Sequence, residues 1–381
     1  FTDRRQRQMC IRDRYIYKGS LPSLLDDQQD EDDNREDKES KDKEAVKDNS
    51  KNDSKLLLFR STDFSDVQDR TVQKINGEYT YFGAELAYFV DKMERGFDRL
   101  IMVVGHDHIG CKARWQAVVK ALNEIMNKDV KLELVFLQLV KYVKNNSVVD
   151  MSKRKGSFIA AEEMIKVLGK DAVRIFMLSS KYTSELTLDF EKIKMAHKDN
   201  SVFYVQYAHV RICSVFRKLL EMSNSNYGYK SIKSKYEKLL VDLDNKVKEG
   251  SSDNLKEFEK NSKDNESNLQ IEVNISVKNF LMDIIYNNYE LHDVEVQILR
   301  LLGVWNRVMS KTIKSLEPNL IINYIIKIAT ALHSLWNTKN YRILDEKNVN
   351  LSVSRLILLK SIQYVLRSGF KVLNVKPMEI M

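Results

Sequence analysis

The sequence predicts a mixed α/β domain followed by an all-α domain. Between residues 81 and 140, segments with helical spacing alternate with short apolar runs, which is typical of an α/β domain with parallel strands. From about residue 190, apolar residues instead recur every three or four positions, as in a bundle of amphipathic helices. The chain has 381 residues, 43% of them hydrophobic, so it can bury two or three cores.

The first half reads as strand, loop, helix and strand in succession. The helix candidates are residues 84–97 and 113–122, and the strand candidates are residues 99–104 and 131–140. Gly96 ends the first helical stripe, and the apolar run RLIMVV ends at Gly105, as a buried parallel strand does. This order predicts a doubly wound α/β domain, in which ligands bind beyond the carboxyl ends of the strands.

The second half shows four long helical patterns. They cover residues 201–220, 294–313, 320–337 and 354–370. In the first of them one apolar stripe contains Val202, Val205, Ile212, Phe216 and Leu219. Three- and four-residue spacing places these side chains on one face, so we expect a helical bundle.

Two polar segments are expected to stay outside the packed cores. Residues 26–54 contain thirteen acidic and six basic residues, and residues 224–274 are rich in Lys, Asn, Ser, Asp and Glu. We interpret the first as a disordered acidic insertion and the second as a low-complexity insertion with at most a short surface helix. Residues 1–14 show neither a targeting core nor a helical period, and we interpret them as an artefact or a disordered end.

Charge and cysteine content narrow the class of protein. The formal net charge is +8, so the chain outside residues 26–54 carries +15, which suits nucleic acid or simply a lysine-rich surface. Cys10, Cys111 and Cys213 have no paired spacing, which favours a reducing compartment, the cytoplasm, over a disulfide framework or a zinc knuckle. No apolar run has the length of a membrane span.

Two loops carry the candidate chemistry. In GHDHIG, residues 105–110, a glycine lets backbone approach a ligand, and the carboxylate of Asp107 can accept from a ribose hydroxyl. His106 and His108 lack an evident third metal ligand, so we favour a nucleotide loop and expect no metal site. In MSKRKG, residues 151–156, a lysine-bearing loop after a strand can close over a triphosphate and stabilise departing pyrophosphate; the alternative is an ordinary solvated loop.

Several blocks resemble the arginyl-tRNA synthetases, a family of class I aminoacyl-tRNA synthetases. DMSKRKGSF resembles their KMSKS signature, with Asp150 where the first lysine of that signature stands. The blocks LFRSTDFSDVQDR, GEYTYFGAELAYFVDKMERGFDRLIMVVGHDHIG, GKDAVRIFML and VFYVQYAHVRICSV follow in the order of the family. The resemblance implies the second half of a Rossmann catalytic domain in residues 15–189 and a helical anticodon-binding domain in residues 190–381.

The resemblance also implies roles for particular residues. Arginine binding is expected from Tyr81 and Glu85, ATP binding from Gly105, Asp107, His108, Met151 and Lys153, and catalysis from Ser152, Lys153 and Arg154. Tyr207, Arg211 and Met381 are expected to enclose an anticodon base. The family usually has Asp at the position of Glu85, and the competing interpretation of Tyr81 and Tyr207 is that they are core residues.

The implied activity is ligation of arginine to its tRNA. ATP with Mg²⁺ is expected as a substrate, with no tightly bound cofactor, and the partners are tRNA(Arg) and arginine, with no membrane and a monomeric protein. No H-x-G-H motif precedes residue 15, so we expect this chain to correspond to the C-terminal part of such an enzyme and to be inactive alone. The alternatives are a non-catalytic tRNA-binding module and, with less support, another class I synthetase.

Overall fold

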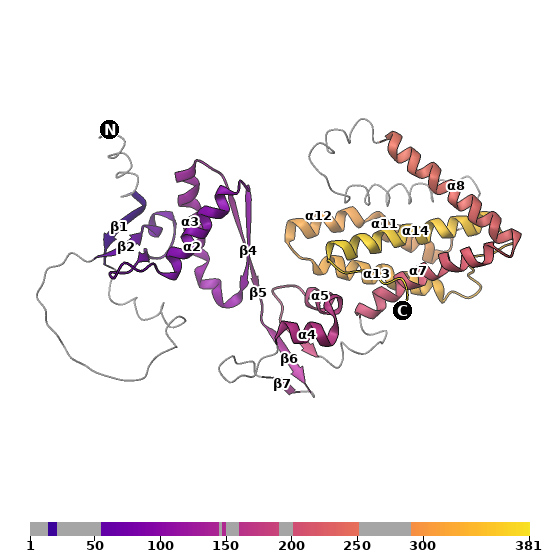
Figure 1. Cartoon of the computed structure of the whole chain (residues 1–381), viewed down its shortest axis with the longest axis horizontal. Coiled ribbons are helices and arrows are strands. Elements are labelled where there is room, and N and C mark those ends of the chain that lie inside the picture. Colours follow the sequence, from indigo (N-terminus) through magenta and orange to yellow (C-terminus); the bar gives the residue numbers. More distant parts are fainter. Residues whose placement is uncertain (1–13, 21–54, 145–146, 150–159, 190–200, 251–290) are drawn as a thin grey trace, which may run out of the picture. The chain divides into compact units, whose positions relative to one another are not determined.

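The computed structural model describes residues 14–20, 55–144, 147–149, 160–189, 201–250 and 291–381 (Figure 1). These residues divide into two compact units, Phe1–Leu137 and Gln138–Met381. Each unit has its own buried apolar cluster, as expected for separate cores. No helix among the described residues is long and apolar enough to cross a membrane.

Unit 1 combines two small sheets with two helices. Its elements are β1 (Ile16–Gly19), β2 (Leu56–Phe59), η2 (Ser61–Phe64), β3 (Arg70–Gln73), α2 (Tyr81–Glu94), β4 (Arg99–Gly105), η3 (His106–Cys111), α3 (Lys112–Met126) and β5 (Lys131–Leu137). The strands β1, β2 and β3 form an antiparallel sheet, whereas β4 and β5 pair in parallel with α3 between them in the chain. Strand, helix, parallel strand is the order that the sequence predicts.

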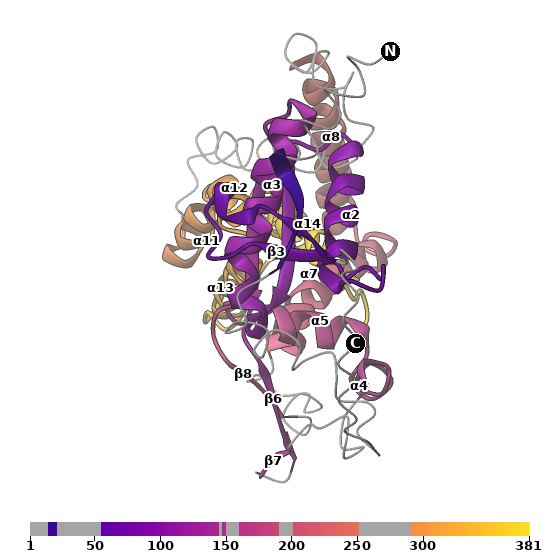
Figure 2. The same ribbon diagram turned by 90° about the vertical axis from the view of Figure 1, so that its left-hand side faces the viewer.

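The helices α2 and α3 pack on one face of the β4–β5 pair (Figure 2). Phe89 and Met93 from α2 and Trp115 from α3 are buried against Leu100 of β4. On the opposite face of β4, no described element of unit 1 covers Ile101 and Val103, which are 44% and 59% exposed. The predicted strand and its parallel pairing are therefore confirmed, and within unit 1 the described helices cover one face of this strand.

Unit 2 contains a third small sheet and the helical bundle. Its elements are β6 (Val140–Lys144), β7 (Ser147–Val149), α4 (Ala161–Leu168), α5 (Lys170–Leu178), β8 (Leu186–Asp189), α7 (Ser201–Ser223), α8 (Tyr227–Gly250), α11 (Asp293–Gly303), α12 (Trp305–Ser315), α13 (Asn319–Trp336) and α14 (Val349–Val372). The sheet has the order β7-β6-β8, in which β8 joins β6 in parallel. The mixed α/β part and the helical part that the sequence predicts are both present.

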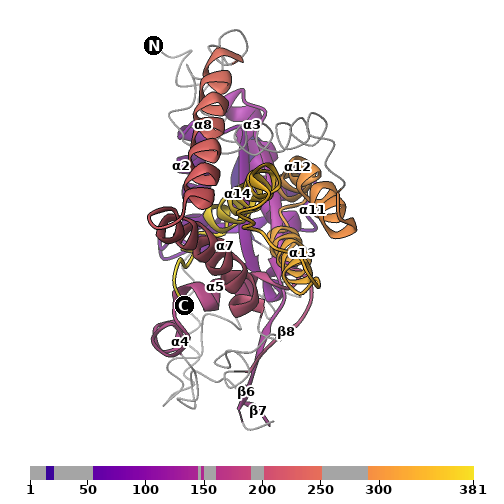
Figure 3. The ribbon, with the colours of Figure 1, turned by 90° about the vertical axis from the view of Figure 1, so that its right-hand side faces the viewer.

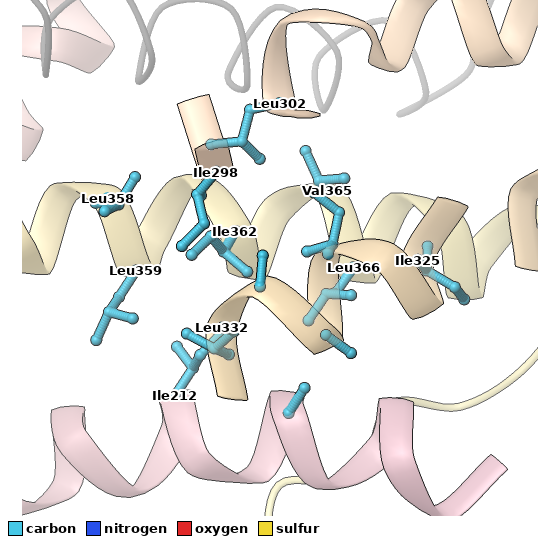
Figure 4. Close-up of a cluster of buried hydrophobic side chains, with 14 of the residues drawn as sticks. Ile212, Ile298, Leu302, Ile325, Leu332, Leu358, Leu359, Ile362, Val365 and Leu366 are labelled. Atoms are coloured by element: carbon cyan, nitrogen blue, oxygen red, sulfur yellow. The ribbon is translucent and has the colours of Figure 1, made fainter. Parts of the chain in front are cut away.

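The core of unit 2 lies between α7, α11, α13 and α14 (Figure 4). Ile212, Ile298, Leu332 and Ile362, one from each of these helices, converge there with their side chains fully buried. Each residue belongs to an apolar stripe with three- and four-residue spacing, so burying the stripe holds the helices together. This is the bundle expected from the spacing of apolar residues.

Two boundaries differ from the sequence prediction. The division between units follows Leu137 instead of residue 189, and Ile175 of α5 is buried in the helical core, so α5 packs with the bundle. The helix α8 occupies much of the predicted insertion at residues 224–274 and runs beside α14 (Figure 3). Ile232 and Tyr236 of α8 are buried, so the expectation that this segment contributes no core is wrong for its first part.

Candidate functional site

In unit 1 the predicted nucleotide loop follows β4 directly. Gly105 ends the strand, and η3 begins at His106. A Cβ atom at Gly105 would lie 2.3 Å from Asp107 Oδ1, so a larger residue there would displace the Asp107 carboxylate from its present position. Asp107 and His108 have exposed side chains, and His108 Nε2 lies 3.7 Å from Asp107 Oδ2. The loop therefore presents a carboxylate and an imidazole at the carboxyl end of a parallel strand, where the sequence placed them.

The predicted arginine-binding residues lie at the start of α2. The Thr80 side chain caps this helix by accepting from the Gly83 amide, at 3.1 Å. Tyr81 is 70% exposed, so it is not the core residue that the alternative interpretation required. Glu85 lies one turn further along and is half-buried.

Two residues that the sequence did not single out surround Glu85. Trp115 Nε1 donates to Glu85 Oε2 at 3.1 Å, and Arg114 NH2 lies 3.7 Å from the same oxygen. The Trp115 ring is also 6.5 Å from the His108 ring, measured between centroids. Trp115 thus joins the carboxylate predicted for arginine binding to the loop predicted for ATP binding. A buried tryptophan at the start of a helix carries no sequence signal that distinguishes it from core.

The predicted signature residues cannot be located. Met151, Ser152, Lys153 and Arg154 lie outside the described residues. Among the described residues there is also no group of three or more His, Cys, Asp or Glu side chains able to hold a metal ion.

In unit 2 the predicted anticodon residues are brought together on α7. Tyr207 and Arg211 lie one turn apart, and the Arg211 guanidinium carbon is 4.5 Å from the centroid of the Tyr207 ring. Phe203, one turn earlier, stacks on Tyr207 with centroids 5.6 Å apart. An arginine and two aromatic rings therefore follow one face of the helix.

The helix α13 completes this arrangement with two residues that the sequence analysis missed. The His333 ring stacks on the Tyr207 ring with their centroids 5.7 Å apart. The centroid of the Trp336 ring lies 5.5 Å from the Arg211 guanidinium carbon. We call Phe203, Tyr207, Arg211, His333 and Trp336 the aromatic platform. Histidine and tryptophan three residues apart share a helical face, but only the fold shows that this face meets α7.

Hydrogen bonds fix the His333 ring in the platform. Arg211 NH1 donates to Nδ1 at 3.0 Å, and Nε2 donates to the Tyr204 carbonyl oxygen at 3.2 Å. Burial is the main cause that lowers the pKa of His333; the Tyr204 hydrogen bond opposes this change and the Arg211 charge adds to it. His333 is therefore neutral near pH 7, with an Nδ1 lone pair that accepts from Arg211.

The C-terminal tail, residues 373–381, lies along a neighbouring face of α7. Gln206 Nε2 donates to the Lys376 carbonyl, and the Met378 amide donates to Gln206 Oε1, both at 2.9 Å. His209 Nδ1 donates to the Met378 carbonyl at 2.7 Å. The tail is thus fixed by buried polar side chains.

Further bonds tie the tail to α5 and α14. The Lys376 amide donates to Asp171 Oδ2 at 3.1 Å, and Arg174 Nε donates to the Leu373 carbonyl at 2.8 Å. Arg367 NH2 donates to Glu379 Oε1 at 3.0 Å. The tail therefore connects three helices of unit 2.

Met381, the third residue predicted to enclose an anticodon base, does not join the aromatic platform through any described contact. Its side chain is 49% exposed, and among the described residues no hydrogen bond, ion pair or ring contact links it to Tyr207 or Arg211. Gln206 and Tyr207 are adjacent, so the tail and the platform lie about 100° apart around the helix. The predicted enclosure of one base by all three residues stays a prediction.

Comparisons with known proteins agree with the resemblance seen in the sequence. Residues 258–381 match the family described as the DALR anticodon binding domain. The chain is 36% identical over 328 residues to the arginine–tRNA ligase of Rickettsia typhi, which covers 85% of this chain and 48% of the relative. It is 33% identical over 329 residues to that of Orientia tsutsugamushi strain Boryong, covering 85% of this chain and 47% of the relative.

A solved structure gives the same result for the fold. The arginyl-tRNA synthetase of Thermus thermophilus superposes with a TM-score of 0.55 at 14% identity, over 86% of this chain and 54% of that chain. The chain spans about half the length of the curated relatives it matches. This chain is thus similar to the arginine–tRNA ligases over about half of their length, and its residues 258–381 match the DALR anticodon binding domain.

Proposed function

We propose that this chain supplies the anticodon-binding part and a portion of the catalytic part of an arginine–tRNA ligase. The observation that carries the proposal is the aromatic platform. A guanidinium held over Tyr207 and beside Trp336, on a positively charged protein, is a common means of binding an unpaired RNA base. The DALR match in the same unit and the ligase relatives support this function.

For unit 1 we propose part of a Rossmann-type catalytic domain. The parallel β4–α3–β5 unit, with a glycine turn at the end of β4, supports this assignment. Gly105, Asp107 and His108 would bind ATP. Arginine would bind at Tyr81 and Glu85.

Glu85 is suited to a guanidinium because it already contacts one. Its carboxylate lies 3.7 Å from Arg114 and accepts a hydrogen bond from Trp115, so it already forms a charge pair with a guanidinium. Substrate arginine would bind beside Arg114 or displace it. A carboxylate can accept two parallel bonds from a guanidinium, which gives selectivity for arginine over lysine.

The proposed chemistry has two steps. The carboxylate of arginine attacks the α-phosphate of ATP and expels pyrophosphate. A hydroxyl of the terminal ribose of tRNA(Arg) then attacks the arginyl carbonyl and releases AMP. Lys153, Arg154 and Ser152 are proposed to stabilise the charge of the leaving pyrophosphate, with Mg²⁺ bound to ATP as part of the substrate. We further propose a monomer that works in the cytoplasm.

Measurement of tRNA affinity tests the anticodon assignment. The 381-residue chain should bind tRNA(Arg) about tenfold more tightly than the same tRNA with a substituted anticodon, the scale of one lost base stack. Fluorescence anisotropy at fixed salt concentration gives both dissociation constants. Equal affinity for the two RNAs would contradict anticodon recognition by the platform.

A further inference from the structure

A cavity of about 470 Å³ lies beside the aromatic platform in unit 2. On α7 it is lined by Ser214 and Lys218, which follow Arg211 by three and seven residues and so share its helical face. Trp336 also lines the cavity, while Arg211 lies over its ring at 5.5 Å. The cavity and the platform therefore share Trp336 as a common wall.

The lining combines positive charge with aromatic rings. Lys218 and Arg342 supply the charge, and Tyr229, Trp336 and Tyr341 supply the rings. Among the described residues, no acidic side chain lines the cavity, and neither Lys218 nor Arg342 has an ion-pair partner. Unneutralised cations beside aromatic rings suit a ligand that is anionic and has a flat ring, such as a nucleotide.

The wall formed by residues 341–344 is already fixed. The Tyr341 hydroxyl donates to Glu295 Oε1 at 2.5 Å, and the Arg355 guanidinium lies 3.8 Å from the Tyr341 ring centroid. Arg355 NH1 also donates to the Arg342 carbonyl at 2.5 Å. A wall that is ordered before binding costs less entropy when a ligand enters, and the volume is in the range of ligand sites, roughly 300–1,000 Å³.

We propose that this cavity binds a second unpaired nucleotide of the tRNA anticodon loop, next to the one at the platform. This inference rests on the proposed function, because the two sites share Trp336 and would bind neighbouring nucleotides of one strand. The base would stack on Tyr229 or Tyr341, and its phosphate would lie near Lys218 and Arg342. Single-stranded RNA is commonly bound in this way, with splayed bases on aromatic rings and the backbone on cations.

The test uses the 381-residue chain and anticodon stem-loop RNAs in which each loop nucleotide in turn lacks its base. Tyr229→Ala should weaken binding of the intact stem-loop about tenfold. The loss should vanish for one abasic position, and that position should differ from the one that removes the effect of Tyr207→Ala. Tyr229→Phe keeps the ring and should bind like the parent.

The outcomes separate the two proposals. Two results would show that the cavity is not a nucleotide site while leaving the proposed function intact. In the first, Tyr229→Ala loses the same affinity for the intact RNA and for every abasic RNA. In the second, Tyr229→Ala keeps its affinity for the intact RNA whereas Tyr207→Ala loses affinity. If Tyr207→Ala also loses nothing, both proposals fail. A thermal melt of Tyr229→Ala shows whether the fold is kept, and failure of Tyr229→Phe to restore binding contradicts stacking.

A salt titration tests the phosphate contact independently. Lys218→Ala should lower the slope of log affinity against log salt by about one unit, as expected for one lost phosphate contact. Lys314→Ala is the matched control, since Lys314 is an exposed lysine on α12, which does not line the cavity. An equal change in both variants would overturn the assignment of Lys218.

Discussion

Tyr207 contacts three other residues of the aromatic platform, Phe203, Arg211 and His333. Tyr207→Ala is expected to cost ~1–3 kcal/mol of tRNA affinity, the value of one base–aromatic stack. The loss should disappear for a tRNA whose contacted anticodon base has been removed. Tyr227→Ala is the control, because Tyr227 is 86% exposed on α8 and should bind normally. An equal loss for intact and abasic tRNA would mean that Tyr207 is structural.

His333 makes stability depend on pH. Burial lowers the pKa of His333 and likewise that of His209, so both contribute stability above the unfolded value of about 6.5. This stability is lost as pH falls below about 6.5 toward their folded pKa values, because the unfolded chain then binds more protons. Protonation of His333 would also place a proton on Nδ1 against the Arg211 guanidinium.

Urea unfolding at several pH values between 7.5 and 5 measures this effect. His333→Gln should flatten the pH dependence, because a glutamine accepts from Arg211 without titrating. His106→Gln, at an exposed position, should leave the profile of the parent unchanged. A profile that is the same in all three proteins would contradict a buried neutral His333.

At the scale of elements, α8 has the clearest consequence for stability. Ile232 is fully buried against the bundle, so Ile232→Ala should destabilise the protein by about 2–4 kcal/mol through lost burial and a cavity. Val241 lies on the same helix and is 57% exposed, so Val241→Ala should change the free energy of unfolding by less than ~0.5 kcal/mol. Chemical denaturation followed by circular dichroism measures both. Equally small changes in the free energy of unfolding for both variants would mean that α8 does not pack against the bundle.

The misassigned part of α8 shows how composition misleads. Because the segment is rich in lysine and serine, it was interpreted as a low-complexity insertion. However, Ile232 and Tyr236 lie four residues apart on one helical face. These two buried side chains pack α8 against the apolar core of the bundle. Mean composition averages this stripe away, whereas periodicity within residues 227–241 would have shown it.

The strands and helices with a strong apolar pattern were predictable from the sequence. Which of their faces other elements cover was not predictable. The run RLIMVV identified β4, and the parallel order with β5 followed from the helix between them. Whether Ile101 and Val103 are covered depends on which elements lie above that face. No local pattern contains that information.

The residues of the candidate site were likewise only partly predictable from the sequence. The resemblance of VFYVQYAHVRICSV to the arginyl-tRNA synthetases implied Tyr207 and Arg211, and their four-residue spacing places them on one helical face. His333 and Trp336 lie more than a hundred residues later, on α13, and only the packing of α13 on α7 brings them to Tyr207. Trp115 beside Glu85 is a second example, since the bond crosses from α3 to α2.

At the scale of the whole molecule, the signature loop can be tested in a full-length ligase that contains this chain. Lys153→Ala should slow formation of arginyl-adenylate, measured by exchange of pyrophosphate into ATP, much more than it weakens tRNA binding. The lysine is expected to meet charge that develops as pyrophosphate departs, so its loss falls on the transition state. Lys155→Ala removes a neighbouring charge and is the comparison. Equal losses of exchange and of tRNA affinity would count against the role of Lys153.

The tail along α7 has a consequence for biosynthesis. The Gln206 side chain bonds to Lys376, 170 residues later, and the buried His209 bonds to Met378. A ribosome adds roughly 5–20 residues per second, so on the order of ten to thirty seconds pass between synthesis of the two partners. During that interval Gln206 and His209 of α7 lack these hydrogen-bond partners, so this part of unit 2 is completed only after residues 376–378 have been translated. Nascent chains truncated before Lys376 should therefore be more sensitive to protease at α7 than the released protein.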